Sequence, residues 1–280
     1  MKFSIITINY NNCEGLRRTL ESVVNQTCRD FEYIVIDGGS TDGSKELIEQ
    51  YADRIDYWVS EPDKGIYNAM NKGIAVAKGE YCNFMNSGDT FVDSGVLDNA
   101  LRCSFTEDIV TGIQIVGVYK KGLFSKLCVD YPQEQPSALR FYTGSISHQS
   151  SFIRTALLKS KGYREDFKIV SDWVFFFDEL VFNNCSYRSL DIQVANFDTQ
   201  GISSQTETSV YTLHMRERQE YINQRFLPRI MIDYDRLVYG ATPLEKIVCQ
   251  WGEHSIFRKI LFLFAWLLDK IRSLKRAIWK

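Results

Sequence analysis

Short apolar runs alternate with amphipathic stretches along the first 90 residues. The runs are rich in β-branched and aromatic residues, which predicts buried strands, and the stretches repeat apolar residues every three or four positions, which predicts helices. Strand–helix–strand alternation at this spacing implies parallel strands joined by helical crossovers. The expected strands are 3–8, 31–36, 55–59 and 80–85, and the expected helices carry Leu16–Val24, Leu47–Tyr51 and 66–77.

The pattern loosens beyond Asp89. Residues 135–150 are polar and rich in Ser, Gln and Pro, which favours a mobile loop over a site. The other segments predict a mixed α/β continuation that ends in helices. They are a helix at 96–101, strands at 108–118 and 123–131, a strand end and short helix at 151–160, an aromatic helix after Ser171-Asp172, a strand at 187–197 and mostly helix at 207–238.

Three of the predicted strands end in polar residues. Asn9-Tyr10-Asn11 follows the first strand, Asp37-Gly38-Gly39 the second, and Asn86-Ser87-Gly88-Asp89 the fourth. The carboxyl ends of parallel strands share one edge of a sheet, so we expect a ligand crevice there. The Asp89 carboxylate could hold a metal ion or a charged substrate, and the alternative for residues 86–89 is an ordinary surface turn.

Several functional classes are excluded or disfavoured. The formal net charge is −2, so general basicity gives no argument for nucleic-acid binding. Gly38 and Gly43 have the spacing of a phosphate-binding loop, but Ser44-Lys45 follows in the wrong order for ATP hydrolysis. No Gly-x-Gly-x-x-Gly follows the first strand, which argues against a dinucleotide-dependent dehydrogenase. The seven scattered cysteines and the polar amino terminus indicate a cytoplasmic protein.

The carboxyl-terminal stretch 257–280 differs electrostatically from the rest of the chain. It carries seven Lys/Arg and one Asp, a balance of +6 that leaves −8 for the remainder. Its longest apolar run, 260–268, is too short to span a bilayer, which needs about 20 residues. We expect an amphipathic helix on an anionic membrane surface, and the alternative is a helix packed on the core with a solvated basic face.

Several blocks of this sequence resemble glycosyltransferase family 2. The matching segments are 4–11 (SIITINYN), 22–26 (SVVNQ), 37–44 (DGGSTDGS), 61–73 (EPDKGIYNAMNKG) and 79–81 (GEY). The resemblance is close over about the first 90 residues and continues at scattered positions to about 205. It implies the GT-A fold, a Rossmann-like mixed sheet flanked by helices, and transfer of a sugar from a nucleotide diphosphate with inversion.

The resemblance also implies a nucleotide site. Asp37 is expected to accept from N3–H of uracil, with capping of its own turn as the alternative. Tyr10 and the 7–11 backbone would frame the base, and His148 would lie near the diphosphate or the acceptor, or act as a structural hydrogen-bonded His. The expected nucleotide-sugar-binding residues are Thr7, Asn9, Tyr10, Asn11, Asp37, Gly39, Asp63, Lys64, Gly65, Asn86 and His148.

The family's catalytic base falls on Asp172, which would deprotonate the acceptor hydroxyl, and the alternative for Asp172 is a helix cap. The family's Asp-x-Asp falls on Asn86-Ser87-Gly88. Asp89 is therefore the only carboxylate left to bind a divalent metal, Mg²⁺ or Mn²⁺, together with donor phosphates. The Gln-x-x-Arg-Trp motif of processive members is missing, which implies one sugar added per encounter.

These observations predict a non-processive inverting glycosyltransferase that uses a nucleotide-diphosphate sugar, with UDP favoured. Its expected acceptor is a saccharide or a polyprenyl-diphosphate-linked molecule of surface polysaccharide synthesis, at the inner face of the cell membrane. The alternatives are a catalytically silent nucleotide-sugar-binding scaffold and, less favoured, a nucleotidyltransferase. The expected domains are a nucleotide-sugar-binding half at 1–100, an acceptor-binding half with the base at 101–205, and a helical extension at 206–280.

Overall fold

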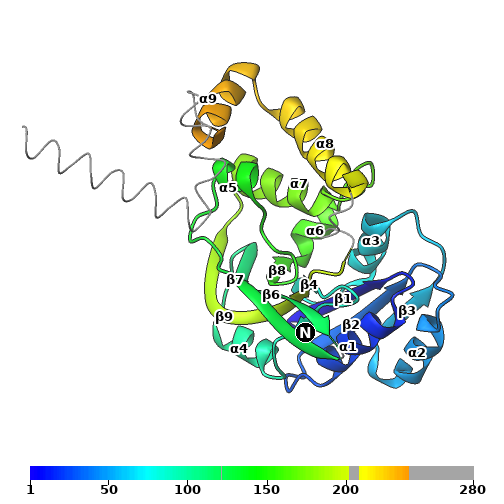
Figure 1. The fold of residues 1–280 in the computed structure, drawn as a ribbon. Coiled ribbons are helices and arrows are strands. Elements are labelled where there is room, and N and C mark those ends of the chain that lie inside the picture. Colours follow the sequence, from blue (N-terminus) through cyan, green and yellow to red (C-terminus); the bar gives the residue numbers. More distant parts are fainter. Residues whose placement is uncertain (121, 202–207, 240–280) are drawn as a thin grey trace, which may run out of the picture. The chain divides into compact units, whose positions relative to one another are not determined.

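The computed structural model describes residues 1–120, 122–201 and 208–239, and the chain divides into two compact units, Met1–Tyr221 and Ile222–Lys280. The first unit has the predicted mixed α/β composition (Figure 1). Its strands are β1 Phe3–Asn9, β2 Phe31–Asp37, β3 Tyr57–Ser60, β4 Tyr81–Phe84, β5 Thr90–Phe91, β6 Ile109–Lys120, β7 Leu123–Asp130, β8 Ser151–Arg154 and β9 Tyr187–Asp198. The described helices are α1 Cys13–Val24, α2 Ser44–Gln50, α3 Ile66–Val76, α4 Val96–Arg102, α5 Ala138–Thr143, α6 Thr155–Lys161, α7 Ser171–Phe177, α8 Thr208–Arg225 and α9 Pro228–Tyr239.

One sheet joins all the described strands, in the order β3-β2-β1-β4-β8-β6-β9-β5, with β7 paired to β6. β1 pairs in parallel with both β2 and β4, and β2 pairs in parallel with β3. The predicted parallel crossovers are therefore confirmed. Asn9 and Asp37 are paired in register at the ends of β1 and β2, so the polar strand ends do meet at one edge.

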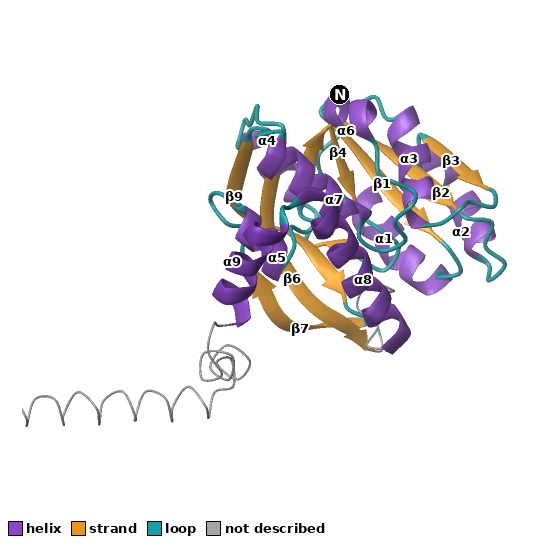
Figure 2. Cartoon of the chain, turned by 90° about the horizontal axis from the view of Figure 1, so that it is seen from above, coloured by secondary structure: helices purple, strands orange, loops and turns teal. Residues whose placement is uncertain are grey.

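Helices cover both faces of the sheet (Figure 2). Apolar side chains of α1, α2 and α4 form one cluster with residues of β1 and β2, including the buried Phe3 and Tyr33. α3 packs on the opposite face of β1 and β2, where a Cβ atom at Gly73 would lie 2.6 Å from Ile6 Cγ2. A glycine at position 73 thus allows α3 to approach β1 closely.

The polar segment 135–150 is not wholly irregular, because it contains the short helix α5. Phe141 of this helix is fully buried and stacks on Phe177, with ring centroids 5.0 Å apart. The indole of Trp173 donates to the carbonyl oxygens of Phe141 and Gly144. One aromatic residue in a polar stretch therefore fixes this segment to α7.

None of the described helices is long and apolar enough to cross a membrane. The prediction of a basic amphipathic helix at 257–280 lies outside the described residues.

Candidate active site

Asp37 ends β2 as the centre of a hydrogen-bonded cluster. Its Oδ1 accepts from Asn9 Nδ2 (2.8 Å) and Ser40 Oγ (2.5 Å), and its Oδ2 accepts from Ser40 N (2.9 Å) and Ser60 Oγ (2.6 Å). Burial alone would raise the pKa of Asp37, but these hydrogen bonds outweigh burial and leave the pKa below its ordinary value. The bond from Ser40 N shows that Asp37 caps its own turn. A carboxylate offers about four acceptor positions, and four donors already occupy them.

The loops around this cluster hold most of the other predicted nucleotide-binding residues. Tyr10 is 66% exposed, and Asn11, at φ 49°, donates its N–H to Ser40 Oγ (2.8 Å). A Cβ atom at Gly38 would lie 2.6 Å from Asp63 Oδ2 and 3.1 Å from Tyr10 Cδ2. The side chains of Tyr10 and Asp63 therefore meet over the Gly38 backbone.

Two of the remaining predicted positions are special backbone sites. Gly39 has φ 79° and Gly65 has φ 121°, conformations that favour glycine. Gly65 precedes α3 and donates its N–H to Asp63 Oδ1 (2.8 Å), while the exposed Lys64 donates its backbone N–H to Asn68 Oδ1.

Thr7 is placed differently from its predicted neighbours. Its side chain is fully buried and its hydroxyl donates to the Met85 carbonyl (2.8 Å), next to the Tyr33 hydroxyl (3.0 Å). The Thr7 side chain thus ties β1 to the end of β4 inside the protein.

A second cluster links four separate elements. Asn86, after β4, lies with Nδ2 3.0 Å from Nε2 of His148, which precedes β8. His148 Nδ1 lies 2.8 Å from Asp172 Oδ2 in the first turn of α7, and the Tyr67 hydroxyl of α3 lies 2.7 Å from Asp172 Oδ1. Asp172 is therefore connected to the end of β4 through one imidazole.

The donors in this cluster define its protonation. When Asn86 Nδ2 donates to His148 Nε2, the imidazole proton lies on Nδ1 and is donated to Asp172. Burial and the Asp172 charge raise the pKa of Tyr67 well above its ordinary value, which keeps its hydroxyl protonated. Burial would raise the pKa of Asp172, yet the hydrogen bonds from His148 and Tyr67 hold it below its ordinary value. Asp172 is ionised at neutral pH.

The Asp172 carboxylate is also accessible to a bound substrate. Its side chain is 17% exposed, and α7 begins one residue earlier with no side-chain cap. The alternative of a helix cap for Asp172 is therefore not what the structure shows. A charged, partly exposed carboxylate with free acceptor positions can take a proton from a bound hydroxyl.

Asp89 lies in a third environment and is almost fully buried. Its Oδ1 accepts from Asp198 N (2.9 Å) and its Oδ2 from Gln149 Nε2 (3.0 Å). Burial raises the pKa of Asp89 to about 7. The Asp198 carboxylate itself pairs with Arg18 (Nη2–Oδ2 3.3 Å). His148 and its neighbour Gln149 thus point to two different carboxylates.

The residues at Asp89 do not enclose a metal ion by themselves. Within the described ranges no three His, Cys, Asp or Glu side chains gather as a ligand set. Asp89 contributes one carboxylate, and each of its oxygens keeps an acceptor position after its hydrogen bond. Such a site suits Mg²⁺ or Mn²⁺ only when a bound diphosphate and water supply the other ligands.

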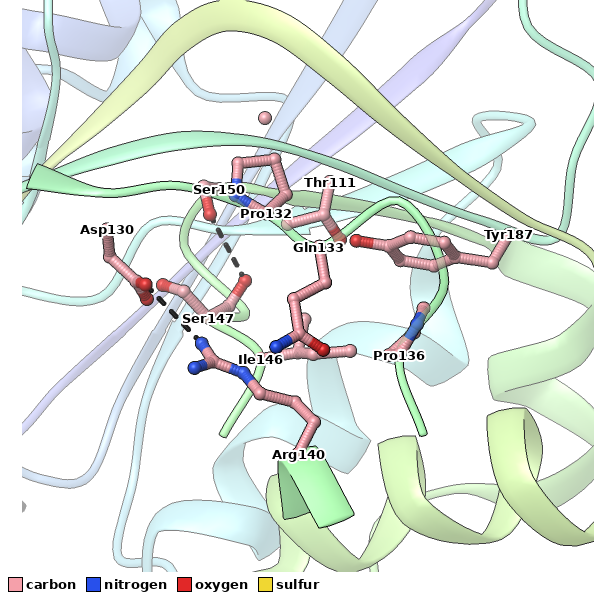
Figure 3. A pocket seen from close by; sticks show the side chains of 11 residues that line it. Thr111, Asp130, Pro132, Gln133, Pro136, Arg140, Ile146, Ser147, Ser150 and Tyr187 are labelled. Atoms are coloured by element: carbon pink, nitrogen blue, oxygen red, sulfur yellow. Dashed lines mark hydrogen bonds and ion pairs between the residues drawn. The ribbon is translucent and has the colours of Figure 1, made fainter. Parts of the chain in front are cut away.

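A polar pocket of about 280 Å³, which includes open solvent, is lined in part by Ser147 and Ser150 (Figure 3). Arg140 and Asp130 form an ion pair at 3.4 Å there, and the Tyr187 hydroxyl points toward Thr111. This hydroxyl is buried and makes no hydrogen bond with any described residue. The pocket was not predicted, and its lining of hydroxyl, amide and charged groups suits polar ligands.

Sequence reasoning missed several partners of the predicted site residues. Tyr67 lies inside the block 61–73 but was given no role, and Ser40 and Ser60 were not recognised as donors to Asp37. Asp198 ends a predicted strand, which is the signal that could have found it. Strand-end polar residues deserve the same weight on every strand of such a sheet.

The parallel first strands, the polar edge at their ends and the helices on both faces of the sheet agree with a GT-A fold. Residues 4–154 match the family described as Glycosyl transferase family 2, and the chain belongs to that family. It is 34% identical over 210 residues to the uncharacterized glycosyltransferase Rv1514c of Mycobacterium tuberculosis, covering 74% of this chain and 78% of the relative.

Solved structures show the same fold at low sequence identity. The S. aureus TarS fragment 1–349 in complex with UDP-GlcNAc has a TM-score of 0.59 at 21% identity, covering 90% of this chain and 73% of the fragment. The mannosyltransferase PcManGT from Pyrobaculum calidifontis, in complex with GDP-Man and Mn²⁺, has a TM-score of 0.58 at 14% identity, covering 95% and 80%. The GT-A fold expected from the sequence is confirmed.

Proposed function

We propose that this glycosyltransferase moves a sugar from a nucleoside diphosphate to an acceptor hydroxyl with inversion, one sugar per encounter. The observation that carries the proposal is the chain Asn86–His148–Asp172–Tyr67, which holds an ionised, partly exposed carboxylate beside the polar strand edge. Inversion needs a base on the face opposite the leaving group, and Asp172 is that base in our proposal.

The chemical step balances with these groups. Asp172 takes the proton of the acceptor hydroxyl, the acceptor oxygen forms a bond to the anomeric carbon, and the bond from that carbon to the phosphate oxygen breaks. The electron pair leaves with the nucleoside diphosphate. His148 and Tyr67 hold the Asp172 carboxylate in place and keep it ionised until the proton arrives.

The donor side of the site rests on the β1–β2 edge. We propose that the base of the nucleotide lies beside Tyr10 and Asp37, with Asp63 to Gly65 nearby. TarS binds UDP-GlcNAc and PcManGT binds GDP-Man, so the fold accepts either base. Uracil is favoured here by the expected contact from its N3–H to Asp37, which requires one of the four donors on Asp37 to move away.

A divalent cation is part of the proposal because PcManGT binds Mn²⁺ and because Asp89 offers a carboxylate at this edge. When bound, the cation neutralises charge on the leaving diphosphate. Asp89→Ala should weaken metal-dependent binding of UDP, measured by calorimetry with and without Mn²⁺. Equal Mn²⁺ dependence in the variant and the wild type would remove Asp89 from the metal site.

The acceptor is proposed to be a saccharide or a polyprenyl-diphosphate-linked molecule of surface polysaccharide synthesis. We propose that the acceptor-binding half is 101–205, which contributes the polar pocket of Figure 3 as well as Asp172. The basic stretch 257–280 supports a location at the inner face of the cell membrane.

A panel of UDP-, GDP- and dTDP-sugars tests the proposal. The correct donor should stabilise the folded protein and be hydrolysed slowly in the presence of Mg²⁺ or Mn²⁺, because water can replace the acceptor. The alternative is a silent nucleotide-sugar-binding scaffold, which the reduced metal motif favours. That protein would be stabilised by a nucleotide sugar and would not hydrolyse it.

A further inference from the structure

Arg218 is a partly buried cation with no ion pair to any described residue. Its Nε is buried and makes no hydrogen bond to any described residue, and no carboxylate within the described ranges lies in ion-pair distance of its guanidinium. The guanidinium lies over the ring of Trp173, 5.0 Å from the centroid. Burial lowers the pKa of Arg218 to about 10, so the side chain stays charged at neutral pH.

The position of Arg218 is fixed by its neighbours on α8. Glu217 is buried and accepts the backbone N–H groups of Lys168 (2.9 Å) and Ile169 (3.0 Å), just before α7. Tyr221, one turn further, packs against Trp173 with ring centroids 5.5 Å apart. The helix is therefore attached on both sides of Arg218, and the guanidinium is held beside Trp173.

The groups around Arg218 belong to the base end of the active site. Trp173 directly follows Asp172 in α7, and the charges of Asp172 and Tyr67 are the ones that act on Arg218. His214 lies one turn before Arg218 on α8 and is affected by its charge. The guanidinium has donor capacity that no described residue uses at Nε, and its place beside the base is where the anion of a ligand can bind.

We propose that Arg218 binds the phosphate or diphosphate group of a lipid-linked acceptor, next to the hydroxyl that Asp172 deprotonates. The inference rests on the proposed function, since it uses Asp172 as the base. A guanidinium offers a planar fork of N–H donors that matches phosphate oxygens. Arg218 lies outside residues 4–154, which match the family model.

The order of the residues Asn86, His148 and Asp172 favours the acceptor, and not the donor, as the ligand whose phosphate binds Arg218. The donor edge lies at Asn86, and His148 separates it from Asp172. Arg218 adjoins Asp172 and Trp173, at the far end from Asn86. A phosphate bound there is next to the base and not next to the strand ends.

Calorimetric titration with farnesyl diphosphate tests the proposal, with farnesol as the probe that lacks phosphate. The protein is first saturated with UDP, or with GDP if only GDP binds. Arg218→Met keeps an unbranched side chain on Trp173 without the charge, and Arg218→Lys keeps the charge without the fork. The control is Arg216→Met, because Arg216 is exposed on the same helix.

Wild-type protein and the control should bind farnesyl diphosphate more tightly than farnesol. Arg218→Met should lose about 10- to 100-fold of the farnesyl diphosphate affinity, Arg218→Lys should lose less, and farnesol binding should not change. The melting temperature of Arg218→Met should stay close to that of the wild type, because the methionine keeps an unbranched side chain on Trp173 and no ion pair with a described residue is lost. A residue with only a structural role would give a lower melting temperature instead.

Three results would overturn the inference. They are equal binding of farnesyl diphosphate and farnesol by the wild type, unchanged farnesyl diphosphate affinity in Arg218→Met, and a selective loss of UDP affinity in that variant, which would assign Arg218 to the donor diphosphate. Hydrolysis of nucleotide sugars is measured separately. If the protein hydrolyses a nucleotide sugar and Arg218→Met has no effect on farnesyl diphosphate binding, this inference is wrong and the proposed function stands. If Arg218→Met weakens farnesyl diphosphate binding but no nucleotide sugar is hydrolysed, the proposed function is wrong and the phosphate site stands.

Discussion

Asp37 and Asp172 are both carboxylates with lowered pKa values, but they are held in opposite ways. Asp37 is fully buried and receives four hydrogen bonds, one from Asn9 of β1, one from Ser60 of β3 and two from Ser40 in the following turn. Asp172 is 17% exposed and receives side-chain hydrogen bonds from His148 and Tyr67, which come from distant parts of the chain.

The difference separates a carboxylate that organises a loop from one that is available for chemistry. Four donors saturate Asp37, so its present contacts serve to shape the strand ends around it. Asp172 is ionised, oriented and still has acceptor capacity on its exposed side. The same type of side chain therefore serves two purposes, and the number of its donors and its exposure distinguish them.

The largest expected effect comes from Asp172→Asn. An amide cannot take the acceptor proton, so turnover should fall by about 10²- to 10⁴-fold. Binding of the nucleoside diphosphate should stay within about twofold, because the polar strand edge is untouched. Turnover is measured with the donor found in the sugar panel, and affinity by calorimetry.

The exposed Asp191→Asn on β9 is the matched control for this variant. It should leave both turnover and affinity unchanged. Normal turnover by Asp172→Asn would show that Asp172 is not the catalytic base.

His148→Ala tests the donors that set the pKa of Asp172. The hydrogen bond from His148 is the main contribution that lowers this pKa, so its loss should raise it. The acidic limb of the pH–rate profile should then move to higher pH, with turnover reduced about 10- to 100-fold. A profile that keeps its acidic limb would mean that His148 does not act on Asp172.

The sequence was sufficient for the elements whose pattern is local. Apolar spacing predicted β1 to β4 and the helices between them, because β1, β2 and β4 are buried almost throughout and the edge strand β3 is partly buried. It was not sufficient for α5, since one buried residue, Phe141, decides that segment through contacts with α7. Contacts between distant segments do not produce a regular spacing of apolar residues in either segment.

In the site, too, single residues could be predicted from the sequence, but the contacts between them could not. Asn86, His148 and Asp172 were each predicted separately, yet nothing in their spacing showed that one imidazole joins them. Arg218 was missed because α8 is strongly charged and reads as a solvated helix. Its contact with Trp173 depends on how two helices meet, which the sequence of neither helix contains.

Asp37→Asn should destabilise the fold by about 1–3 kcal/mol, because its buried donors lose a charged acceptor. The pKa of Asp37 is lower when folded than its ordinary 3.8, so its stabilisation is present above that pH and is lost as pH falls through the folded pKa. The wild type should therefore lose stability more steeply than Asp37→Asn as the pH falls below the ordinary pKa of 3.8, as measured by urea unfolding. Parallel acid dependence in both proteins would contradict this account of Asp37.

Ser60→Ala removes one of the four donors and should have the smallest effect, about 1 kcal/mol in urea unfolding. The variant also frees one acceptor position on Asp37 Oδ2. If Asp37 accepts from N3–H of uracil, UDP affinity should be kept or rise, while the affinity for N3-methyl-UDP, which lacks that donor, should not rise.

A UDP affinity that falls together with stability in Ser60→Ala would instead mean that Asp37 acts only by shaping the loop. The matched control is Ser160→Ala on α6, since its hydroxyl bonds only to the carbonyl of Leu157 on its own helix. Because the Ser160 hydroxyl makes no hydrogen bond to Asp37 or its donors, its loss should leave the affinities for UDP and N3-methyl-UDP unchanged. The ratio of the two nucleotide affinities thus separates a base contact at Asp37 from a purely structural carboxylate.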